Sequence, residues 1–230
     1  VTIHGNTTVT ALFTQDEYTL TINKVGNGTV TKAPNQATYH YGDVVALTAT
    51  PDAGWSFGSW SANVVAGSVT INANTTASVT FTQDEYSLTI NKIGNGTVTK
   101  APDQATYHYG DVVNLTATPD LGWSFGSWSV NVVAGSVTIN TNTVVTATFT
   151  RDEYTLTLSK VGNGTVAAAP SNAHYHYGDV VTLTATPDLG WSFGSWSANA
   201  TGGTVTIHGN TTVIATFTQD EYSLTINKTG

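Results

Sequence analysis

Hydrophobic and polar residues alternate in several short stretches of the chain. Between residues 18 and 23, apolar side chains stand at every second position, which is the period of a half-buried β-strand. Residues 44–50 show the same period, with Val45, Leu47 and Ala49 on one face. We expect this face to be buried. No stretch has a helical period, so we expect no helix longer than a turn.

Turn signals separate the predicted strands. Asn27 and Gly28 form a pair that favours a tight hairpin turn. Residues 18–23 are therefore expected to reverse into a second strand over residues 29–33. The other predicted strands span residues 55–61, 69–71 and 77–81, and the last two of these close the unit as a second hairpin.

The same pattern recurs at a constant interval of 68 residues. Asp-Glu-Tyr begins at residues 16, 84, 152 and 220, and Gly-Trp-Ser-Phe-Gly-Ser-Trp begins at residues 54, 122 and 190. Such self-similarity indicates a repeat array. The chain divides into a closing hairpin of one partial repeat (1–15), three complete repeats (16–83, 84–151 and 152–219) and the opening strand of another partial repeat (220–230).

Differences between the copies indicate which faces are buried. One position is Ala46 in the first repeat, Asn114 in the second and Thr182 in the third. A buried site would resist this exchange, so we expect a solvent-exposed face there. In the last strand, Ala77 precedes Val79, whereas the other copies have Val first and Ala second. The conserved total volume predicts two neighbouring inward positions.

The composition agrees with an all-β protein. Hydrophobic residues make up 40% and charged residues 10% of the 230 residues, and Cys and Met are absent. A net charge of −8 with seven basic residues argues against nucleic acid or an anionic membrane as partner. The apolar runs are far shorter than the roughly 20 residues that span a bilayer. We expect a tandem array of small antiparallel β-sandwich or open-barrel repeats.

Three motifs carry a resemblance to a known family. The matching residues are Gly26, Gly28 and Val30 in a Gly-x-Gly-x-Val hairpin; Tyr39, Gly42, Val45, Leu47, Ala49 and Pro51 in the next segment; and Gly54, Trp55, Phe57 and Trp60 in the aromatic strand. Every copy resembles the divergent internalin B-repeat family, also called bacterial repeat domains, from end to end. The resemblance implies a β-rich module strung in tandem in large secreted or surface-attached prokaryotic proteins, often adhesins.

The aromatic residues are candidates for a carbohydrate-binding surface, because flat rings with an apolar face can stack on sugars. In an unbroken strand, Trp55 and Trp60 face opposite sides and one large ring is exposed. The alternative is a bulge that returns Trp60 to the core; the tyrosines could equally cover a sheet edge. The candidate platforms are Trp55, Tyr39 and Tyr41; Trp123, Tyr107 and Tyr109; and Trp191, Tyr175 and Tyr177.

Metal binding has two sets of candidate residues. His174 and His176 form a His-x-His pair in the third repeat, but no carboxylate or Cys accompanies it, which favours solvent-facing histidines. Asp43, Asp52 and the linker acids 84–85 are candidates for a Ca²⁺ site, although turn chemistry alone explains the two turn Asp residues. We therefore expect no cofactor, with Ca²⁺ as the alternative.

Covalent modification also has candidate residues. Lys24 and its copies could form an isopeptide bond with an Asn near a buried acid, or could simply be solvated charges. Nine sequons of the Asn-x-Ser/Thr type are candidates for glycosylation; they begin at Asn6, Asn27, Asn74, Asn95, Asn114, Asn163, Asn199, Asn210 and Asn227. The hairpin turn already explains the Asn27 copies.

Catalytic residues do not form a recognisable pattern. The sequence contains no Cys, no paired carboxylates on one strand, and no recurring Ser, His and Asp arrangement beyond turn residues. We expect a protein that is not an enzyme.

The expected function is structural: an extracellular stalk or filament of a prokaryotic cell-surface or adhesin-type protein. The linker 82–85 is short and contains no Gly, which indicates stiff coupling between neighbouring repeats. The alternative is a multivalent carbohydrate-binding module that gains avidity from repetition. The expected partners are neighbouring repeats or copies of the same chain, with surface glycans under the alternative.

The two partial repeats predict an association between copies of the chain. Their apolar strand positions would otherwise lack a partner, which invites pairing with another chain. Head-to-tail pairing would join Val9, Ala11 and Phe13 of one molecule to Tyr222, Leu224 and Ile226 of the next, and would propagate into a filament. The alternative is that the array continues with further copies, so that the junction is covalent.

Overall fold

The computed structural model describes residues 2–229. Val1 and Gly230, the outermost residues of the two partial repeats, lie outside the described residues. The chain separates into two compact units, and each is described by itself. One unit comprises Val1–Leu88, Gln104–Val112 and Thr138–Thr143, and the other comprises Thr89–Asp103, Val113–Val137 and Val144–Gly230. The first repeat lies in the former unit and the third repeat in the latter.

Each complete repeat contains six strands at matching positions. The first has β1 (Leu20–Val25), β2 (Gly28–Ala33), β3 (Val44–Pro51), β4 (Trp55–Trp60), β5 (Ser68–Thr70) and β6 (Thr75–Gln83). The second has β7 (Leu88–Ile93), β8 (Gly96–Ala101), β9 (Asp111–Pro119), β10 (Trp123–Trp128), β11 (Ser136–Ile139) and β12 (Thr143–Arg151). The third has β13 (Leu156–Val161), β14 (Gly164–Ala169), β15 (Val180–Pro187), β16 (Trp191–Trp196), β17 (Thr204–Thr206) and β18 (Thr211–Gln219).

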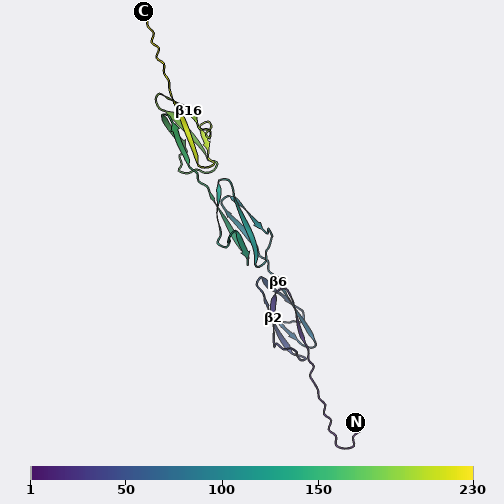
Figure 1. The fold of residues 1–230 in the computed structure, drawn as a ribbon. Coiled ribbons are helices and arrows are strands. Elements are labelled where there is room, and N and C mark those ends of the chain that lie inside the picture. Colours follow the sequence, from purple (N-terminus) through teal and green to yellow (C-terminus); the bar gives the residue numbers. More distant parts are fainter. Residues whose placement is uncertain (1, 230) are drawn as a thin grey trace. The chain divides into compact units, whose positions relative to one another are not determined.

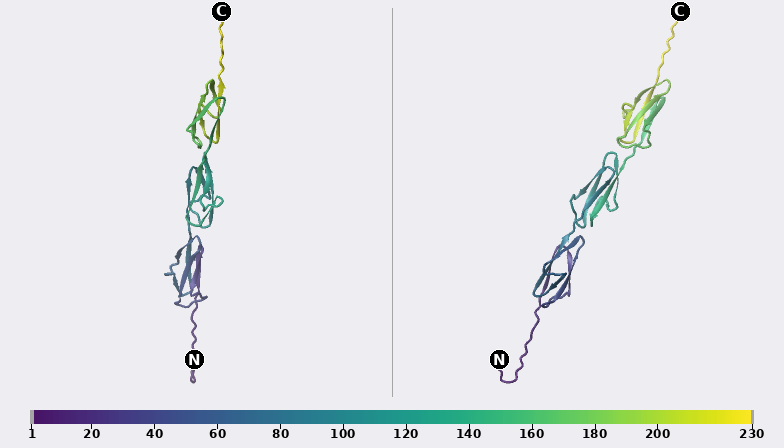
Figure 2. Two further views of the ribbon diagram at one scale, coloured as in Figure 1. Left: turned by 90° about the vertical axis from the view of Figure 1, so that its left-hand side faces the viewer. Right: turned by 180° about the vertical axis from the view of Figure 1, so that it is seen from behind.

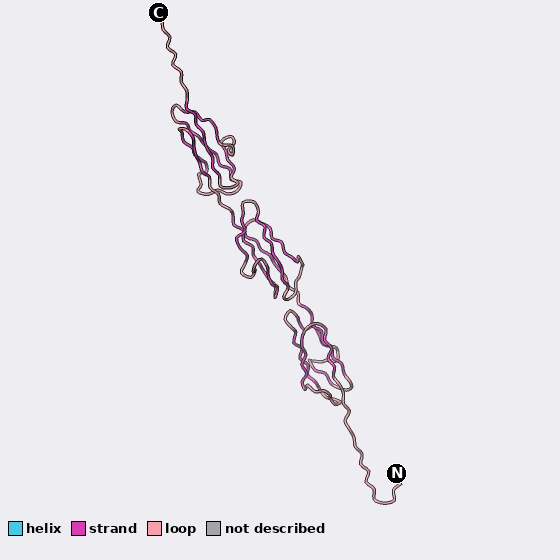
Figure 3. Tube along the Cα trace, viewed as in Figure 1, coloured by secondary structure: helices cyan, strands magenta, loops and turns pink. Residues whose placement is uncertain are grey.

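The secondary structure confirms the predicted all-β class. Figure 3 shows strands and loops but no helix in residues 2–229, so none of these residues forms a helix that could cross a membrane. The alternation read from the sequence therefore reflects strands in all three copies. Figure 2 shows the same strand content from two further directions.

Two three-stranded sheets make up each repeat. In the first repeat, one sheet has the order β1-β6-β4 and the other has the order β2-β3-β5. Figure 1 labels one strand of each sheet, β6 and β2. The third repeat has the corresponding orders β13-β18-β16 and β14-β15-β17. The pairings are antiparallel except that of β1 with β6, which is parallel, with Leu20 opposite Thr75. The repeat is thus an open two-sheet sandwich with one parallel strand pair.

The two hairpins predicted within the repeat are wrong. The turn at Asn27 and Gly28 joins β1 to β2, but these strands belong to different sheets. Its left-handed residue is Gly26, with φ of 82°. The chain crosses here from one layer to the other, as it also does between β5 and β6. Alternation within a strand indicates which side chains face inward. It does not indicate whether consecutive strands pair in one sheet or lie in two facing sheets, because the same side chains are buried in both arrangements.

The core lies between the two sheets, on the faces that the sequence predicts. Val45 and Leu47 of β3 are buried, as are Ala77, Val79 and Phe81 of β6. Ala46 of β3 and its copies Asn114 and Thr182 are exposed, which confirms the predicted solvent-facing side of this strand. The volume exchange between Ala77 and Val79 thus occurs between two neighbouring core positions.

Truncation of a core aromatic residue tests this placement. Phe81 is only 2% exposed, so Phe81→Ala is expected to lower the free energy of unfolding of the first repeat by about 3–5 kcal/mol. Urea unfolding followed by tryptophan fluorescence measures the loss. Val65→Ala in the same repeat is the control, because Val65 is 72% exposed and should tolerate the change. A loss below about 1 kcal/mol for Phe81→Ala would contradict the assignment.

Candidate functional sites on the repeat

The aromatic strand β4 contains a bulge that decides where its rings lie. Its register with β6 shifts between Phe57 and Ser59, so that Phe57 faces Phe81 and Trp60 faces Val79. Since directly opposed residues share a face of a sheet, Phe57 and Trp60 both lie on the inward side. Trp60 packs against the core cluster. The bulge interpretation is confirmed, and the unbroken strand that would expose Trp60 is wrong.

A partly exposed aromatic pair remains on this edge strand. Phe57 is 45% exposed, and its ring centroid lies 6.0 Å from that of the half-buried Trp60. The copies repeat the arrangement, with centroid distances of 5.2 Å between Phe125 and Trp128 and 5.3 Å between Phe193 and Trp196. Sequence reasoning missed the phenylalanine, because only the sheet order shows that β4 is an edge strand, where an inward ring stays accessible.

The tyrosines of the predicted sugar platform do not share one exposed surface. Tyr39 is fully buried, whereas Tyr41 is 70% exposed. The Tyr39 hydroxyl donates a hydrogen bond to the Pro34 carbonyl at 2.9 Å and accepts one from the Gln36 amide at 3.2 Å. A platform that includes Tyr39 is therefore wrong, because this residue closes the core beneath the loop. The same holds for Tyr107 and Tyr175, which are buried, while Trp55, Trp123 and Trp191 are half-buried.

The buried hydroxyl offers a test of this structural role. Tyr39→Phe keeps the ring but leaves the Pro34 carbonyl without its donor, so it should lower the free energy of unfolding by about 1–3 kcal/mol. Tyr41→Phe is the control and should leave stability unchanged, because Tyr41 is largely exposed. Thermal unfolding of the two variants measures the difference. Equal stabilities would contradict a structural role for the Tyr39 hydroxyl.

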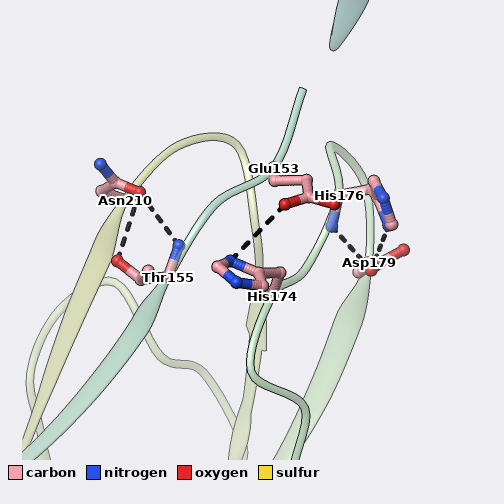
Figure 4. A network of polar contacts seen from close by, with 6 residues as sticks. All are labelled: Glu153, Thr155, His174, His176, Asp179 and Asn210. Carbon is pink, nitrogen blue, oxygen red and sulfur yellow. Dashed lines mark hydrogen bonds and ion pairs between the residues drawn. The ribbon is translucent and has the colours of Figure 1, made fainter. Parts of the chain in front are cut away.

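The polar residues proposed for metals take part in local contacts. The His176 amide donates to the Asp179 carboxylate at 2.8 Å, and the His174 Nδ1 atom lies 3.8 Å from the Glu153 carboxylate (Figure 4). The equivalent Asp43 caps the amide of His40 at 2.8 Å, as expected for an Asp in a turn. Residues 2–229 contain no group of three or more His, Cys, Asp or Glu side chains placed to hold a metal ion.

The candidates for covalent modification lie at exposed positions. The Lys24 amine donates a hydrogen bond to the Gly28 carbonyl at 2.8 Å, as Lys92 does to Gly96. This contact ties the end of β1 to the start of β2 and explains the lysine without an isopeptide bond. All nine sequon asparagines are exposed. The side-chain oxygen of one of them, Asn210, accepts the Thr155 amide at 3.0 Å (Figure 4). Glycosylation stays a prediction.

A cavity of about 320 Å³ opens between β13 and β14 of the third repeat. The one charged residue among those lining it is Lys160, whose amine donates a hydrogen bond to the Gly164 carbonyl. Leu158 and Val166 supply apolar walls. The amine is thus engaged in the same strand-end contact that Lys24 makes in the first repeat.

The linker acid Asp84 connects the end of one repeat to the start of the next. Its amide donates to the Gly54 carbonyl at 2.8 Å, and its carboxylate accepts the Ser56 hydroxyl at 2.6 Å and the Tyr86 hydroxyl at 3.3 Å. Partial burial raises the pKa of Tyr86 above its ordinary value, and the Asp84 carboxylate raises it further. Asp84 thereby anchors the linker. Asp152 makes the same contacts one repeat later.

The terminal segments contain the residues predicted for pairing between chains. Val9, Ala11 and Phe13, and likewise Tyr222, Leu224 and Ile226, are exposed and lie outside any strand. By the 68-residue interval, Leu224 corresponds to Leu20 and Thr7 to Thr75, which are paired in β1 and β6. By sequence position the two segments together correspond to β1, β6 and the end of β5, and they contain no copy of β2, β3 or β4. Head-to-tail pairing stays a prediction, and the denatured mass of any fibres formed would test it.

Comparison with known proteins gives matches that repeat along the chain. No curated protein matches the chain. A family model for the divergent InlB B-repeat domain matches three consecutive segments, residues 18–85, 86–153 and 154–221. These segments have the 68-residue period of the structure and confirm the resemblance carried by the glycine and aromatic motifs. The chain therefore belongs to the divergent InlB B-repeat family.

Proposed function

We propose that this chain is a structural repeat region of a prokaryotic extracellular or cell-surface protein, in which it forms a stalk or filament that holds another part away from the cell. The carrying observation is the linker contact: Asp84 and Asp152 bind the preceding turn in the same way at both junctions between complete repeats. A linker fixed by side-chain contacts suits a spacer better than a flexible tether does.

The polar groups of the repeat support a structural rather than a catalytic role. Asp43 caps a turn, Asp84 anchors a linker and Asn74 accepts the Thr19 amide at 2.9 Å. Each of these side chains holds a connection between strands. We therefore infer a protein that is not an enzyme, whose repeated surfaces serve architecture, as in an adhesin stalk.

Surface labelling of intact cells tests the proposed location. An antibody against the chain is expected to label cells of the source organism before permeabilisation, because the proposed stalk faces the medium. A cytoplasmic enzyme detected in parallel is the control and should be labelled only after permeabilisation. Labelling of the chain that requires permeabilisation would contradict the proposal.

Carbohydrate binding is a second candidate, favoured by the accessible pair of Phe57 and Trp60 and its two copies. A half-exposed Phe beside a half-buried Trp offers an apolar face of the kind on which a sugar ring stacks. Three such pairs in one chain would add avidity. The tyrosine platform has no part in this version of the site, because Tyr39 is buried.

Titration with a panel of β-linked oligosaccharides tests the second candidate. Saturable tryptophan fluorescence changes are expected if the pairs bind sugar, because Trp60 lies next to the proposed stacking face. The combined change of Phe57, Phe125 and Phe193 to Ala should then abolish the response, whereas Val65→Ala should keep it. A flat titration of the unmodified chain would contradict carbohydrate binding and leave the structural function.

A further inference from the structure

The turn between β3 and β4 meets the following repeat at a residue without a side chain. Gly54 has φ of 77° and lies in the same compact unit as Tyr109. A Cβ atom added to Gly54 would lie 2.2 Å from the Cβ of Tyr109 and 3.0 Å from its Cγ. Real Cβ atoms do not approach this closely, so the contact requires glycine.

The second junction repeats this contact within the other compact unit. A Cβ atom on Gly122, whose φ is 76°, would lie 2.3 Å from the Cβ of Tyr177. The third copy, Gly190, has nearly the same φ of 78° but no atom within 4 Å of the added Cβ. Backbone conformation therefore calls for glycine in all three copies, whereas the close approach of tyrosine is confined to the two junctions.

The exposure of the tyrosines follows the same distinction. Tyr41 precedes the first complete repeat's β3 and is 70% exposed. Its copies, which meet a preceding repeat, are more covered: Tyr109 is 48% exposed and Tyr177 is half-buried. Tyr177 also packs on His208 at 4.8 Å between ring centroids, so part of its extra coverage comes from its own repeat.

A closed path of contacts connects the two sides of the first junction. The Gly54 carbonyl accepts the Asp84 amide, and the Asp84 carboxylate accepts the Tyr86 hydroxyl. The Tyr86 backbone exchanges two hydrogen bonds with Tyr107, at 2.8 and 2.9 Å. Tyr107 is two residues before Tyr109, and Tyr109 lies against Gly54, where the path began. The linker is therefore held by the turn that contains Tyr109 as well as by the contacts of Asp84.

The linker contact forms without the tyrosine contact. In the third repeat, the Asp220 amide donates to the Gly190 carbonyl at 2.9 Å, and Ser192 donates to the Asp220 carboxylate at 2.6 Å. Nothing lies against Gly190 there. Anchoring of the linker is thus a property of one repeat, whereas the glycine and tyrosine contact needs two.

We propose that the turns holding Gly54 and Gly122 are docking sites for the Tyr-Gly turn of the following repeat, and that this contact couples the stabilities of neighbouring repeats. The inference deepens the proposed structural function, because a stalk needs repeats that resist independent motion. In repeat proteins such interface terms add to the stability of each unit. A glycine preserves the close approach, and any side chain would separate the two turns.

Three matched variants of the full chain test the coupling: Gly54→Ala, Gly122→Ala and Gly190→Ala. All three place Ala at positive φ, so all three strain their own turn. Only the first two also displace a tyrosine. Hydrogen exchange read by mass spectrometry reports each repeat separately. Gly54→Ala should reduce protection of residues 104–112 about tenfold, the equivalent of about 1.4 kcal/mol, whereas Gly190→Ala should leave that segment unchanged.

A second pair of variants keeps the test informative if the strained turns unfold. Tyr109→Ala removes the ring without altering any glycine, and it should increase exchange in the turn at residues 52–55 of the preceding repeat. Tyr41→Ala is its control and should leave that turn unchanged. Unaltered exchange across the junction in both Gly54→Ala and Tyr109→Ala would overturn the coupling. That result would leave surface labelling unaffected, so the location proposed above could still hold.

Discussion

Each repeat depends on the packing of its two sheets against each other through the inward faces of their central strands, which are β3 and β6 in the first repeat. Val45 and Leu47 on one side, and Ala77, Val79 and Phe81 on the other, supply most of the buried strand residues of the first repeat. A unit of 68 residues buries a small fraction of its surface compared with larger domains, so its core is marginal. This limit explains why contacts outside the core matter, including the Tyr39 hydroxyl under the loop and the linker contacts at each end.

Sequence periodicity predicted which side chains face inward and missed how the strands pair. A two-residue period fixes the inward side of a strand, so the buried positions of β3 and β6 could be read directly. Pairing depends on how the chain leaves a turn, and Gly26, rather than the Asn27-Gly28 pair, takes the left-handed conformation. The parallel pairing of β1 with β6 joins the two ends of the repeat and has no local sequence signal.

Among the candidate site residues too, features set by the local sequence could be predicted, and features set by distant parts of the chain could not. The bulge near Gly58 was predictable, because glycine in an aromatic strand signals irregular pairing. The burial of Tyr39 was not, since its hydroxyl meets groups in a loop rather than in a strand. The accessibility of Phe57 follows from the place of β4 at a sheet edge. The role of Gly54 could not be predicted from one repeat, because only the contact with Tyr109 of the following repeat distinguishes it from Gly190.

The linker anchored by Asp84 and the tyrosine contact at Gly54 give one account of why the linker is short and the interval constant. An added or deleted residue would break the path from Asp84 through Tyr86 to Tyr109. Membership of the divergent InlB B-repeat family agrees with a structural repeat region. In this account, each repeat is stabilised by its own core, and the contacts at the junction couple the stabilities of neighbouring repeats.

The distance distribution between two spin labels on neighbouring repeats tests this account most directly. The sequence contains no Cys, so Val65→Cys and Thr141→Cys, both at exposed positions within one compact unit, would carry the only labels. Double electron–electron resonance is predicted to give a single narrow distance peak, which broadens when Gly54→Ala is added. A broad distribution in the chain without Gly54→Ala would contradict coupled repeats.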